Sequence, residues 1–575
     1  MSELSDIDRQ IIWNRLLAIV EEQAQTLMRT AFNPIVRESG DLSTGLFDLR
    51  GRMIAQAVTG TPGHVNTMAE SVSHFLQHYA LAEMLPDDIY VTNDPWKAAG
   101  HLNDFMLVRP CFHQGKLIGF TSCTSHLADI GGLGYGPDAS DVLDEGLYIP
   151  ILKLVDAGEL NQTFIAILKA NSRVPIEVEG DIYALIACAE RGSERLSQCM
   201  GDFGLTDIND FSDYIIETSR RSCEEKIRSL PEGEFSSSMR IDGYDEPLDL
   251  VASMIIKDGF VEIDFAGSSG MSPYGINCPL NYASAYTCFA LKCAIAPDVP
   301  NNHGSLLQWK ITAPEGSIVN AQFPAPVAMR HVVGQLLPDV AFGCLHQAIP
   351  DVVPAEGTCC LWDLPLRAGY SVGAGSTPFA SELVHNGGTG ARPHSDGLSA
   401  TAYPSGVMGS LVEITETVAP LILWRREFRQ DSAGAGQYRG GLGQVIELSH
   451  REGADMSLFA ALDRIEHPAR GRCGGENGAT GSLQLSSGPY LRAKGQQIIP
   501  GGQTLTVLTP GGAGFGDVTQ RDPAQITQDL RDELISVDSA VRQYGVVVGS
   551  DGRVDPTVSI TSITGQIKQT QENTS

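Results

Sequence analysis

Residues 104–126 read DFMLVRPCFHQGKLIGFTSCTSH, and this stretch does most to define the fold. Two apolar runs, residues 105–112 and 117–122, flank the four residues His113-Gln114-Gly115-Lys116. Two such runs joined by a short loop that contains glycine are typical of a β-hairpin. We therefore expect two antiparallel strands that lie side by side.

The length of the hairpin loop decides which side chains meet at the open end of the hairpin. Directly opposite residues share one face of a sheet, and a shift of one residue moves a side chain to the other face. A three-residue loop around Gly115 pairs Asp104 with Thr124 or His126, so that Asp104 and His126 share a face. A two-residue loop would put them on opposite faces. His101 lies one tight turn before Asp104 and is close enough to join them.

His101, Asp104 and His126 form a ligand set for one divalent metal ion. Two imidazoles and one carboxylate suit Zn²⁺, Mn²⁺ or Fe²⁺ and contain too much nitrogen for Ca²⁺ or Mg²⁺. Three protein ligands leave positions open, and a water bound there would have a pKa of about 7 and act as a source of hydroxide. A histidine at a strand end can also be a hydrogen-bonded core residue. The spacing alone leaves both interpretations open.

Helical patterns lie on both sides of the hairpin. Ser5 and Asp8 form a capping box for an amphipathic helix that reaches about residue 32 and is ended by Pro34. The other elements expected in this half are a helix over 68–84, a strand over 89–92, a four-glycine loop over 129–137 and helices between 181 and 227.

The rest of the chain reads mainly as strands. A hairpin is expected over 253–256 and 260–265, further strands over 412–423, 443–449 and 503–508, and a last helix over 522–544. We therefore predict an α+β fold of several units, with N-terminal helices followed by mixed and antiparallel sheets. The expected units are an N-terminal metal-site domain (1–232), a middle α+β region (233–410), a C-terminal β-rich region with a terminal helix (411–553) and a mobile tail (554–575).

Composition limits the class of protein. The 575 residues, 42% hydrophobic and 19% charged, are too many for one core at roughly 150 residues per domain. The net charge of −29 disfavours nucleic acid and anionic membrane surfaces as partners. The 12 cysteines contain no C-x-x-C pair, which favours free thiols in a reducing compartment. With a polar N-terminus and no apolar run of about 18 residues, we expect a cytoplasmic protein without signal peptide or membrane span.

A series of short motifs runs in order from about residue 6 to residue 544. It comprises Glu38-Ser39-Gly40-Asp41, Thr92-Asn93-Asp94-Pro95, Gly100-His101-Leu102-Asn103-Asp104, Ser125-His126-Leu127-Ala128-Asp129-Ile130-Gly131-Gly132, Glu145-Gly146-Leu147-Tyr148-Ile149-Pro150, Asn277-Cys278-Pro279, Asp431-Ser432-Ala433-Gly434-Ala435-Gly436, Tyr438-Arg439-Gly440-Gly441-Leu442-Gly443 and Pro510-Gly511-Gly512-Ala513-Gly514-Phe515-Gly516-Asp517. Each motif is weak alone, but together they are specific. The chain resembles the hydantoinase B/oxoprolinase family, which includes the smaller subunits of ATP-dependent hydantoinases and lactamases.

The resemblance implies the same metal site. Related ketone carboxylases hold a divalent metal with a His-x-x-Asp pair and a later histidine, which correspond to His101, Asp104 and His126. Lactamase members add an upstream aspartate, and Asp41 fits that place. Asp129 competes as fourth ligand because His126-x-x-Asp129 repeats the spacing. We favour Asp41 and expect Asp129 to support the ligands or face the substrate.

Glycine-rich stretches at 131–136, 434–443 and 511–516 could suggest a phosphate-binding loop. None matches G-x-x-x-x-G-K-[ST], or G-x-G-x-x-G between a strand and a helix, so tight turns are the better interpretation. The resemblance places ATP on another chain, a larger ATPase-fold subunit of the hydantoinase A/oxoprolinase type in an α2β2 hetero-oligomer.

Ser125 and Cys359-Cys360 have no context that would activate a nucleophile.

The resemblance implies the metal-dependent subunit of an ATP-dependent hydrolase of a cyclic amide: a hydantoin, 5-oxoproline or a lactam such as caprolactam. The partner would phosphorylate the carbonyl oxygen, and water activated by the metal would then open the ring. One alternative is a subunit of a ketone carboxylase that acts on acetone- or acetophenone-type substrates with bicarbonate, although such subunits are generally longer than 575 residues. The other is a non-catalytic binding subunit.

Overall fold

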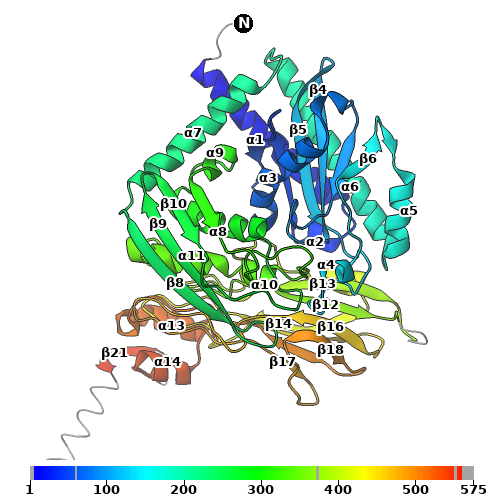
Figure 1. Cartoon of the computed structure of the whole chain (residues 1–575). Helices are drawn as coiled ribbons and strands as arrows, with labels where there is room; N and C mark the ends of the chain where they lie inside the picture. The colour runs from blue at the N-terminus through cyan, green and yellow to red at the C-terminus, as the bar shows by residue number, and fades with distance from the viewer. Residues whose placement is uncertain (1–4, 59–60, 371–374, 550–552, 560–575) are drawn as a thin grey trace, which may run out of the picture.

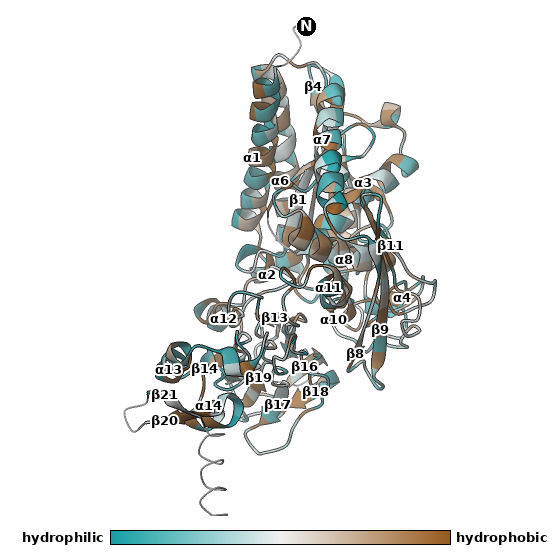
Figure 2. Cartoon of the chain, turned by 90° about the vertical axis from the view of Figure 1, so that its left-hand side faces the viewer, coloured by the Kyte–Doolittle hydropathy of each residue, from teal (hydrophilic) through white to brown (hydrophobic). Residues whose placement is uncertain are grey.

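The computed structural model describes residues 5–58, 61–370, 375–549 and 553–559. Long helices of the N-terminal part lie at one end of the molecule, and the antiparallel sheets of the C-terminal part lie at the other (Figures 1 and 2). The predicted α+β class, with N-terminal helices followed by mixed and antiparallel sheets, is confirmed.

The N-terminal part is built around one antiparallel sheet. Its elements are α1 (Asp6–Thr30), α2 (Pro34–Arg37), β1 (Leu42–Phe47), β2 (Met53–Gln56), α3 (Pro62–His78), η1 (Leu81–Glu83), β3 (Ile89–Thr92), β4 (Asp104–His113), β5 (Lys116–His126), α4 (Val142–Glu145), β6 (Leu152–Asp156), β7 (Glu159–Leu160), α5 (Gln162–Asn171), α6 (Pro175–Asp202) and α7 (Asn209–Arg228). The seven strands lie in the order β2-β1-β5-β4-β3-β6-β7. Helices α1 and α6 cover one face and α3 covers the other, so the hairpin β4–β5 lies between two apolar layers.

The hairpin is confirmed, but its turn differs from the prediction. The turn has two residues, Gln114 and Gly115, both with positive φ as a tight two-residue hairpin turn requires. A β-bulge follows, because Cys111 lies opposite Gly119 while Phe112 lies opposite Leu117. The extra residue on β5, Ile118, shifts the pairing of the two strands by one residue, as a three-residue loop would have done. Asp104 therefore lies directly opposite His126, as predicted, although the three-residue loop was wrong.

The middle part has a smaller mixed sheet. Its elements are β8 (Gly233–Ile241), β9 (Leu248–Lys257), β10 (Phe260–Asp264), α8 (Leu280–Ile295), α9 (His303–Leu306), β11 (Trp309–Thr312), α10 (His331–Gly334) and α11 (Leu337–Ala348). The order is β11-β10-β9-β8, with β10 and β11 parallel, and α8 and α11 pack against it. Helix α8 also packs on α3, which joins the middle part to the N-terminal part.

The C-terminal part contains two four-stranded sheets that share one apolar core. Its elements are β12 (Trp362–Ala368), β13 (Phe379–His385), α12 (Val412–Val418), β14 (Leu421–Phe428), β15 (Gln444–His450), β16 (Met456–Ala461), β17 (Ser482–Leu485), β18 (Lys494–Ile499), β19 (Leu505–Leu508), η2 (Val518–Gln520), α13 (Pro523–Arg531), α14 (Val537–Tyr544), β20 (Val546–Val548) and β21 (Val554–Ser559). The orders are β13-β12-β16-β18 and β14-β15-β19-β17, and β20 pairs with β21. Residues 550–552 and 560–575, within or beside the expected tail, lie outside the described residues.

Three sequence predictions need correction. The helix expected over 68–84 is α3, which begins at Pro62, a favoured first residue of a helix, and ends at His78. The strand expected over 412–423 begins as helix α12, because tertiary context overrides the β-propensity of its branched residues. The helix expected over 522–544 is two helices, and Ser536 caps the second. The first helix and its Ser5–Asp8 capping box are confirmed.

All 12 cysteines lie in the described part of the chain, and all are free thiols. Among the described residues, no helix is both long and apolar enough to cross a bilayer.

Gly63 at the start of α3 provides a test of the close packing between α3 and α8. A Cβ at Gly63 would lie 2.3 Å from Cε2 of Tyr282, whose ring is buried. We expect Gly63→Ala to destabilise the protein by about 1–3 kcal/mol, the usual cost of overpacking, and to lower the midpoint of thermal unfolding. Gly270→Ala is the matched control, because nothing lies within 4 Å of its Cβ position. Equal midpoints for the two variants would contradict this packing.

Candidate metal centre

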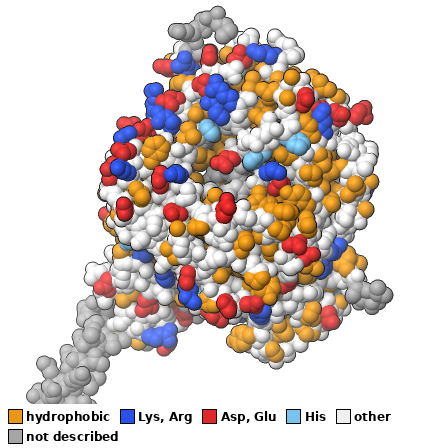
Figure 3. Space-filling view, viewed as in Figure 1, with side chains coloured by type: hydrophobic (Ala, Val, Ile, Leu, Met, Phe, Trp, Pro, Cys, Tyr) orange, Lys and Arg blue, Asp and Glu red, His pale blue; other side chains and the backbone are white. Residues whose placement is uncertain are grey.

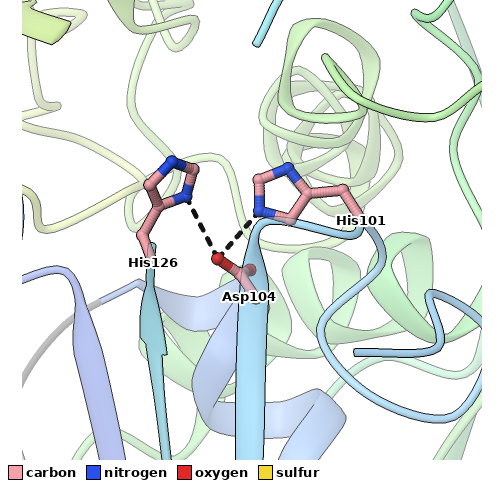
Figure 4. A group of neighbouring side chains, drawn as sticks. All are labelled: His101, Asp104 and His126. Atoms are coloured by element: carbon pink, nitrogen blue, oxygen red, sulfur yellow. Dashed lines mark hydrogen bonds and ion pairs between the residues drawn. The ribbon is translucent and has the colours of Figure 1, made fainter. Parts of the chain in front are cut away.

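Asp104 is the centre of the candidate site (Figure 4). Its carboxylate is fully buried, and Oδ1 lies 2.8 Å from Nε2 of His101 and 3.2 Å from Nδ1 of His126. The other oxygen, Oδ2, lies 2.7 Å from Nε2 of His64 and 2.6 Å from Nη2 of Arg330. The hairpin positions Asp104 and His126 at its open end, and the turn before β4 brings in His101. The three predicted residues are therefore brought together.

The contact between His101 and Asp104 lacks the geometry of a hydrogen bond. Nδ1 of His101 lies 3.0 Å from the carbonyl oxygen of Ala328, which can only accept, so Nδ1 carries the proton. In the neutral ring, Nε2 then presents a lone pair to Oδ1 of Asp104 at 2.8 Å, and no hydrogen bond to Nε2 is found among the described residues. Two acceptors this close repel each other unless a cation lies between them. The donor set therefore fits a metal ion.

The distances agree with shared coordination. Two donor atoms that each lie about 2.1 Å from one ion, at right or tetrahedral angles, are about 3.0–3.4 Å apart. The two N···O distances at Oδ1, 2.8 and 3.2 Å, are close to that range. Oδ1 of Asp104, Nε2 of His101 and Nδ1 of His126 are therefore the atoms that would hold the ion.

An outer contact orients one of the two imidazoles. The Ala328 carbonyl accepts the Nδ1–H of His101 at 3.0 Å. A ligating histidine usually donates its second N–H to a carbonyl or carboxylate, which fixes the tautomer and the ring orientation. Nε2 of His126 lies 3.5 Å from Oε2 of Glu382 and forms no hydrogen bond among the described residues.

Burial and charge act against each other in this cluster. Burial alone would raise the pKa of Asp104, but the charge that His101 carries in acid, together with His64 and Arg330, outweighs burial and holds the pKa of Asp104 well below its usual range. Burial, with Arg330 nearby, lowers the pKa of His101 to about 4, so this ring is neutral at pH 7. Burial opposes protonation of His64 as well, but Asp104 and Asp41 raise its pKa. The cluster thus combines an ionised carboxylate with a neutral imidazole, the protonation states that metal ligation requires.

The two candidates for a fourth ligand lie in different places. Oδ1 of Asp41 lies 3.3 Å from Nδ1 of His64 and accepts a hydrogen bond from Thr61 (2.5 Å), so His64 lies between Asp41 and Asp104. Asp129 accepts from the backbone N–H of Arg173 (2.5 Å) and from its guanidinium (2.6 Å). Asp41 lines the same cavity as the histidines, and Asp129 is not among the residues that line it.

The cavity beside Asp104 is small, about 20 Å³, which is room for one water or ion. Its polar lining comes from all three parts of the chain: Asp41, Thr61, His64, His101, His126, Tyr135, Tyr282, Arg330, His331, Gln335, Asp363 and Glu382. Six residues that bear directly on the site were not predicted from the sequence: His64, Tyr135, Arg330, His331, Asp363 and Glu382. No local spacing links them to the hairpin, so only the tertiary structure could find them.

A second set of polar side chains in the cavity can hold or move a proton. Burial raises the pKa of Asp363 on β12 to about 7, and burial together with Asp363 raises the pKa of Glu382 on β13 well above its usual range. Nε2 of His331 lies 3.7 Å from Asp363, and Nδ1 of His331 lies 3.3 Å from the hydroxyl of Tyr135. Through Glu382, which lies 3.5 Å from Nε2 of His126, these side chains connect the proposed ligands to strands β12 and β13 of the C-terminal part.

A larger groove of about 510 Å³ lies between α3, α8 and β11. Its lining mixes apolar side chains such as Trp309 with polar ones such as Glu70 and Lys310.

The face drawn in Figure 3 is hollowed above its middle, with histidine and acidic side chains around the hollow. On that face, basic side chains are interspersed with acidic ones.

Two solved structures share this fold. The nucleotide-free structure of acetone carboxylase matches with a TM-score of 0.85 at 20% identity, covering 98% of this chain and 84% of that chain. The ATP-dependent caprolactamase from Pseudomonas jessenii matches with a TM-score of 0.85 at 23% identity, covering 97% and 99%. At these identities the likeness establishes the fold alone.

The sequence decides the family. The family model for hydantoinase B/oxoprolinase matches residues 5–518, and the chain belongs to this family. Among its relatives, the uncharacterized protein MJ0963 of Methanocaldococcus jannaschii is 31% identical, covering 95% of this chain and 96% of that protein. The putative D-/L-hydantoinase B subunit of a Pseudomonas species is 28% identical, covering 96% and 97%. The predicted resemblance is confirmed.

Metal content tests the choice between the two His-x-x-Asp pairs. We expect the wild-type chain to retain one divalent ion after dialysis, measured by elemental analysis. Asp104→Asn should lose it, because the substitution removes the anionic donor at the centre of the cluster. Asp129→Asn is the matched control and should keep it, because Asp129 binds Arg173 instead. Loss of the ion from the Asp129 variant alone would contradict the assignment.

Proposed function

We propose that this chain is the metal-dependent subunit of an ATP-dependent hydrolase of cyclic amides. The single observation that carries the proposal is the facing pair of acceptors, Nε2 of His101 and Oδ1 of Asp104, at a buried site in a hydantoinase B/oxoprolinase chain. His101, Asp104 and His126, whose ligand atoms lie within 4.8 Å of one another, would hold one Zn²⁺, Mn²⁺ or Fe²⁺ ion. Asp41 lies outside this group but lines the same cavity, and it is proposed as the fourth ligand. Such an ion would supply a water of lowered pKa as the nucleophile.

The substrates we propose are a hydantoin, 5-oxoproline or a lactam such as caprolactam. Relatives support this choice, because their names include a putative D-/L-hydantoinase, 5-oxoprolinase 1 and a caprolactamase. The overall reaction converts one amide, one ATP and two waters to the ring-opened acid, ADP and phosphate. An unstrained amide is a poor electrophile, so the partner would first transfer the terminal phosphoryl group of ATP to its oxygen. Water would then add to the activated carbon, the ring nitrogen would leave with a proton, and a second water would release phosphate from the acyl phosphate that remains.

The residues around the cavity would perform the remaining tasks. Arg330 keeps Asp104 ionised and is close enough to the cavity to neutralise an anionic oxygen of the substrate. The neighbouring carboxyl groups of Asp363 and Glu382, whose pKa values burial raises, can deliver a proton to the leaving nitrogen. Because the cavity has room for little more than a water, the substrate requires the cavity to open.

The partner we propose is a larger subunit with an ATPase fold, of the hydantoinase A/oxoprolinase type, in an α2β2 assembly. Two relatives support the existence of a partner, because one is named as the B subunit of a hydantoinase and the other as the beta subunit of a caprolactamase. The sequence of this chain contains no match to the common nucleotide-binding loops, which agrees with an ATP site on another chain. We propose a cytoplasmic location for the complex.

The test is turnover of the reconstituted complex with hydantoin, 5-oxoproline and caprolactam, measured as ring-opened product per ATP consumed. We expect His101→Ala to abolish both turnover and bound metal, because its Nε2 is a proposed ligand. His113→Ala is the matched control, because His113 lies at the other end of the same hairpin and contacts Ser197. Full turnover by the metal-free His101 variant would refute the mechanism.

The same assay separates the alternatives. Incorporation of labelled bicarbonate into product from acetone or acetophenone, without ring opening of any amide, would identify a ketone carboxylase subunit. The acetone carboxylase fold keeps this alternative open, with bicarbonate as co-substrate. Neither reaction and no bound metal would identify a non-catalytic binding subunit.

A further inference from the structure

Residues 327–331 (the 327–331 segment) bring a backbone carbonyl and two side chains to the metal cavity. The carbonyl of Ala328 lies 3.0 Å from Nδ1 of His101, and Arg330 donates to Oδ2 of Asp104 at 2.6 Å. His331 follows and lies 3.3 Å from the hydroxyl of Tyr135. The segment is irregular up to Arg330 and enters the short helix α10 at His331. Its position must therefore be fixed by contacts from outside.

Glu145 provides the contact at the start of the segment. Its Oε1 accepts the backbone N–H groups of Val327 (2.5 Å) and Ala328 (2.7 Å). The side chain is 2% exposed, and Oε2 has no hydrogen-bond partner among the described residues. Gly146 follows with a φ of +155°, and a Cβ there would lie 2.8 Å from Ile130. The backbone at the end of α4 is thus fixed so that Glu145 points inward.

The two N–H groups that Glu145 accepts have no other acceptor among the described residues. Buried backbone N–H groups are nearly always paired, and leaving two of them unpaired is costly. Without the Glu145 carboxyl, the start of the segment would move to find other acceptors. The Ala328 carbonyl belongs to the next peptide unit, whose N–H, that of Met329, donates to the Gly275 carbonyl at 2.7 Å. Loss of Glu145 would leave this single anchor, so the carbonyl could turn and hold the Nδ1–H of His101 less firmly.

We propose that Glu145 is a positioning residue for the metal: it fixes the Ala328 carbonyl, which orients the His101 ring, and so tightens binding of the divalent ion. The inference rests on the metal site of the proposed function. Among the described residues, Glu145 forms no hydrogen bond to the three ligands and does not line the cavity, so we expect its effect to reach the metal through the 327–331 segment.

The test is the affinity of the full-length chain for Mn²⁺ and for Zn²⁺, each measured by competition with a chromogenic chelator. We expect Glu145→Ala to weaken binding by about 10- to 100-fold, the usual effect of losing an outer contact of a metal ligand. Glu145→Gln should stay within about threefold of wild type, because the amide oxygen can accept the same two N–H groups. Burial also raises the pKa of Glu145 to about 8, so the neutral amide resembles the group present at pH 7.

Asp88 supplies a matched control. It is also a fully buried carboxylate that accepts two backbone N–H groups, from Leu85 (2.9 Å) and Ala157 (2.8 Å). It precedes β3 at the end of the sheet away from Asp104. Asp88→Ala should lower the midpoint of thermal unfolding as Glu145→Ala does, without changing metal affinity. A purely structural role for Glu145 would make the two variants behave alike.

A folded Glu145→Ala that binds both ions as tightly as wild type would overturn the inference. If that variant does not fold, Glu145→Asp decides, because it keeps the carboxyl group but withdraws the acceptor by one methylene. Wild-type affinity in Glu145→Asp would then overturn the inference, and weaker binding would support it. A wild-type chain that binds neither ion would instead overturn the metal site of the proposed function, so the two failures are distinguishable.

Discussion

A carboxylate that is fully removed from water, that of Asp104, meets side chains from four separate segments of the chain. A buried charge without partners costs several kcal/mol, so these contacts must form together for the fold to be stable. Arg330 and His64 hold one oxygen, which leaves the other free to face two imidazoles. The position of the proposed metal follows from this division of the two oxygens.

Strand register is the second constraint. With the two-residue turn at Gln114–Gly115 alone, Asp104 would pair with Ser125, and the His126 side chain would point to the opposite face of the sheet. The bulge at Ile118 shifts the register by one residue and brings His126 opposite Asp104. A local irregularity in a sheet thus aims the side chains of a site, as bulges near active sites often do.

The hairpin supplies the proposed ligands, but the rest of the chain completes the site. The middle part contributes the Ala328 carbonyl and Arg330, and the C-terminal part contributes Asp363 and Glu382. The close packing of α3 on α8 brings the N-terminal and middle parts together around Tyr282, whose ring lies under the Arg330 guanidinium. Asp104 and Arg330, 226 positions apart in sequence, therefore share one buried network, and its chemistry depends on how the three parts pack.

The sequence by itself determined the fold class, the first helix with its cap, the hairpin and the trio His101, Asp104 and His126. Those features depend on hydrophobic periodicity and on short spacings, which a sequence displays directly. It misjudged the hairpin turn and the ends of several helices, because bulges and tertiary packing decide them. Only the tertiary structure brought His64, Arg330, Glu382 and Glu145 to the site, since buried charges pair through space and leave no local pattern in the sequence.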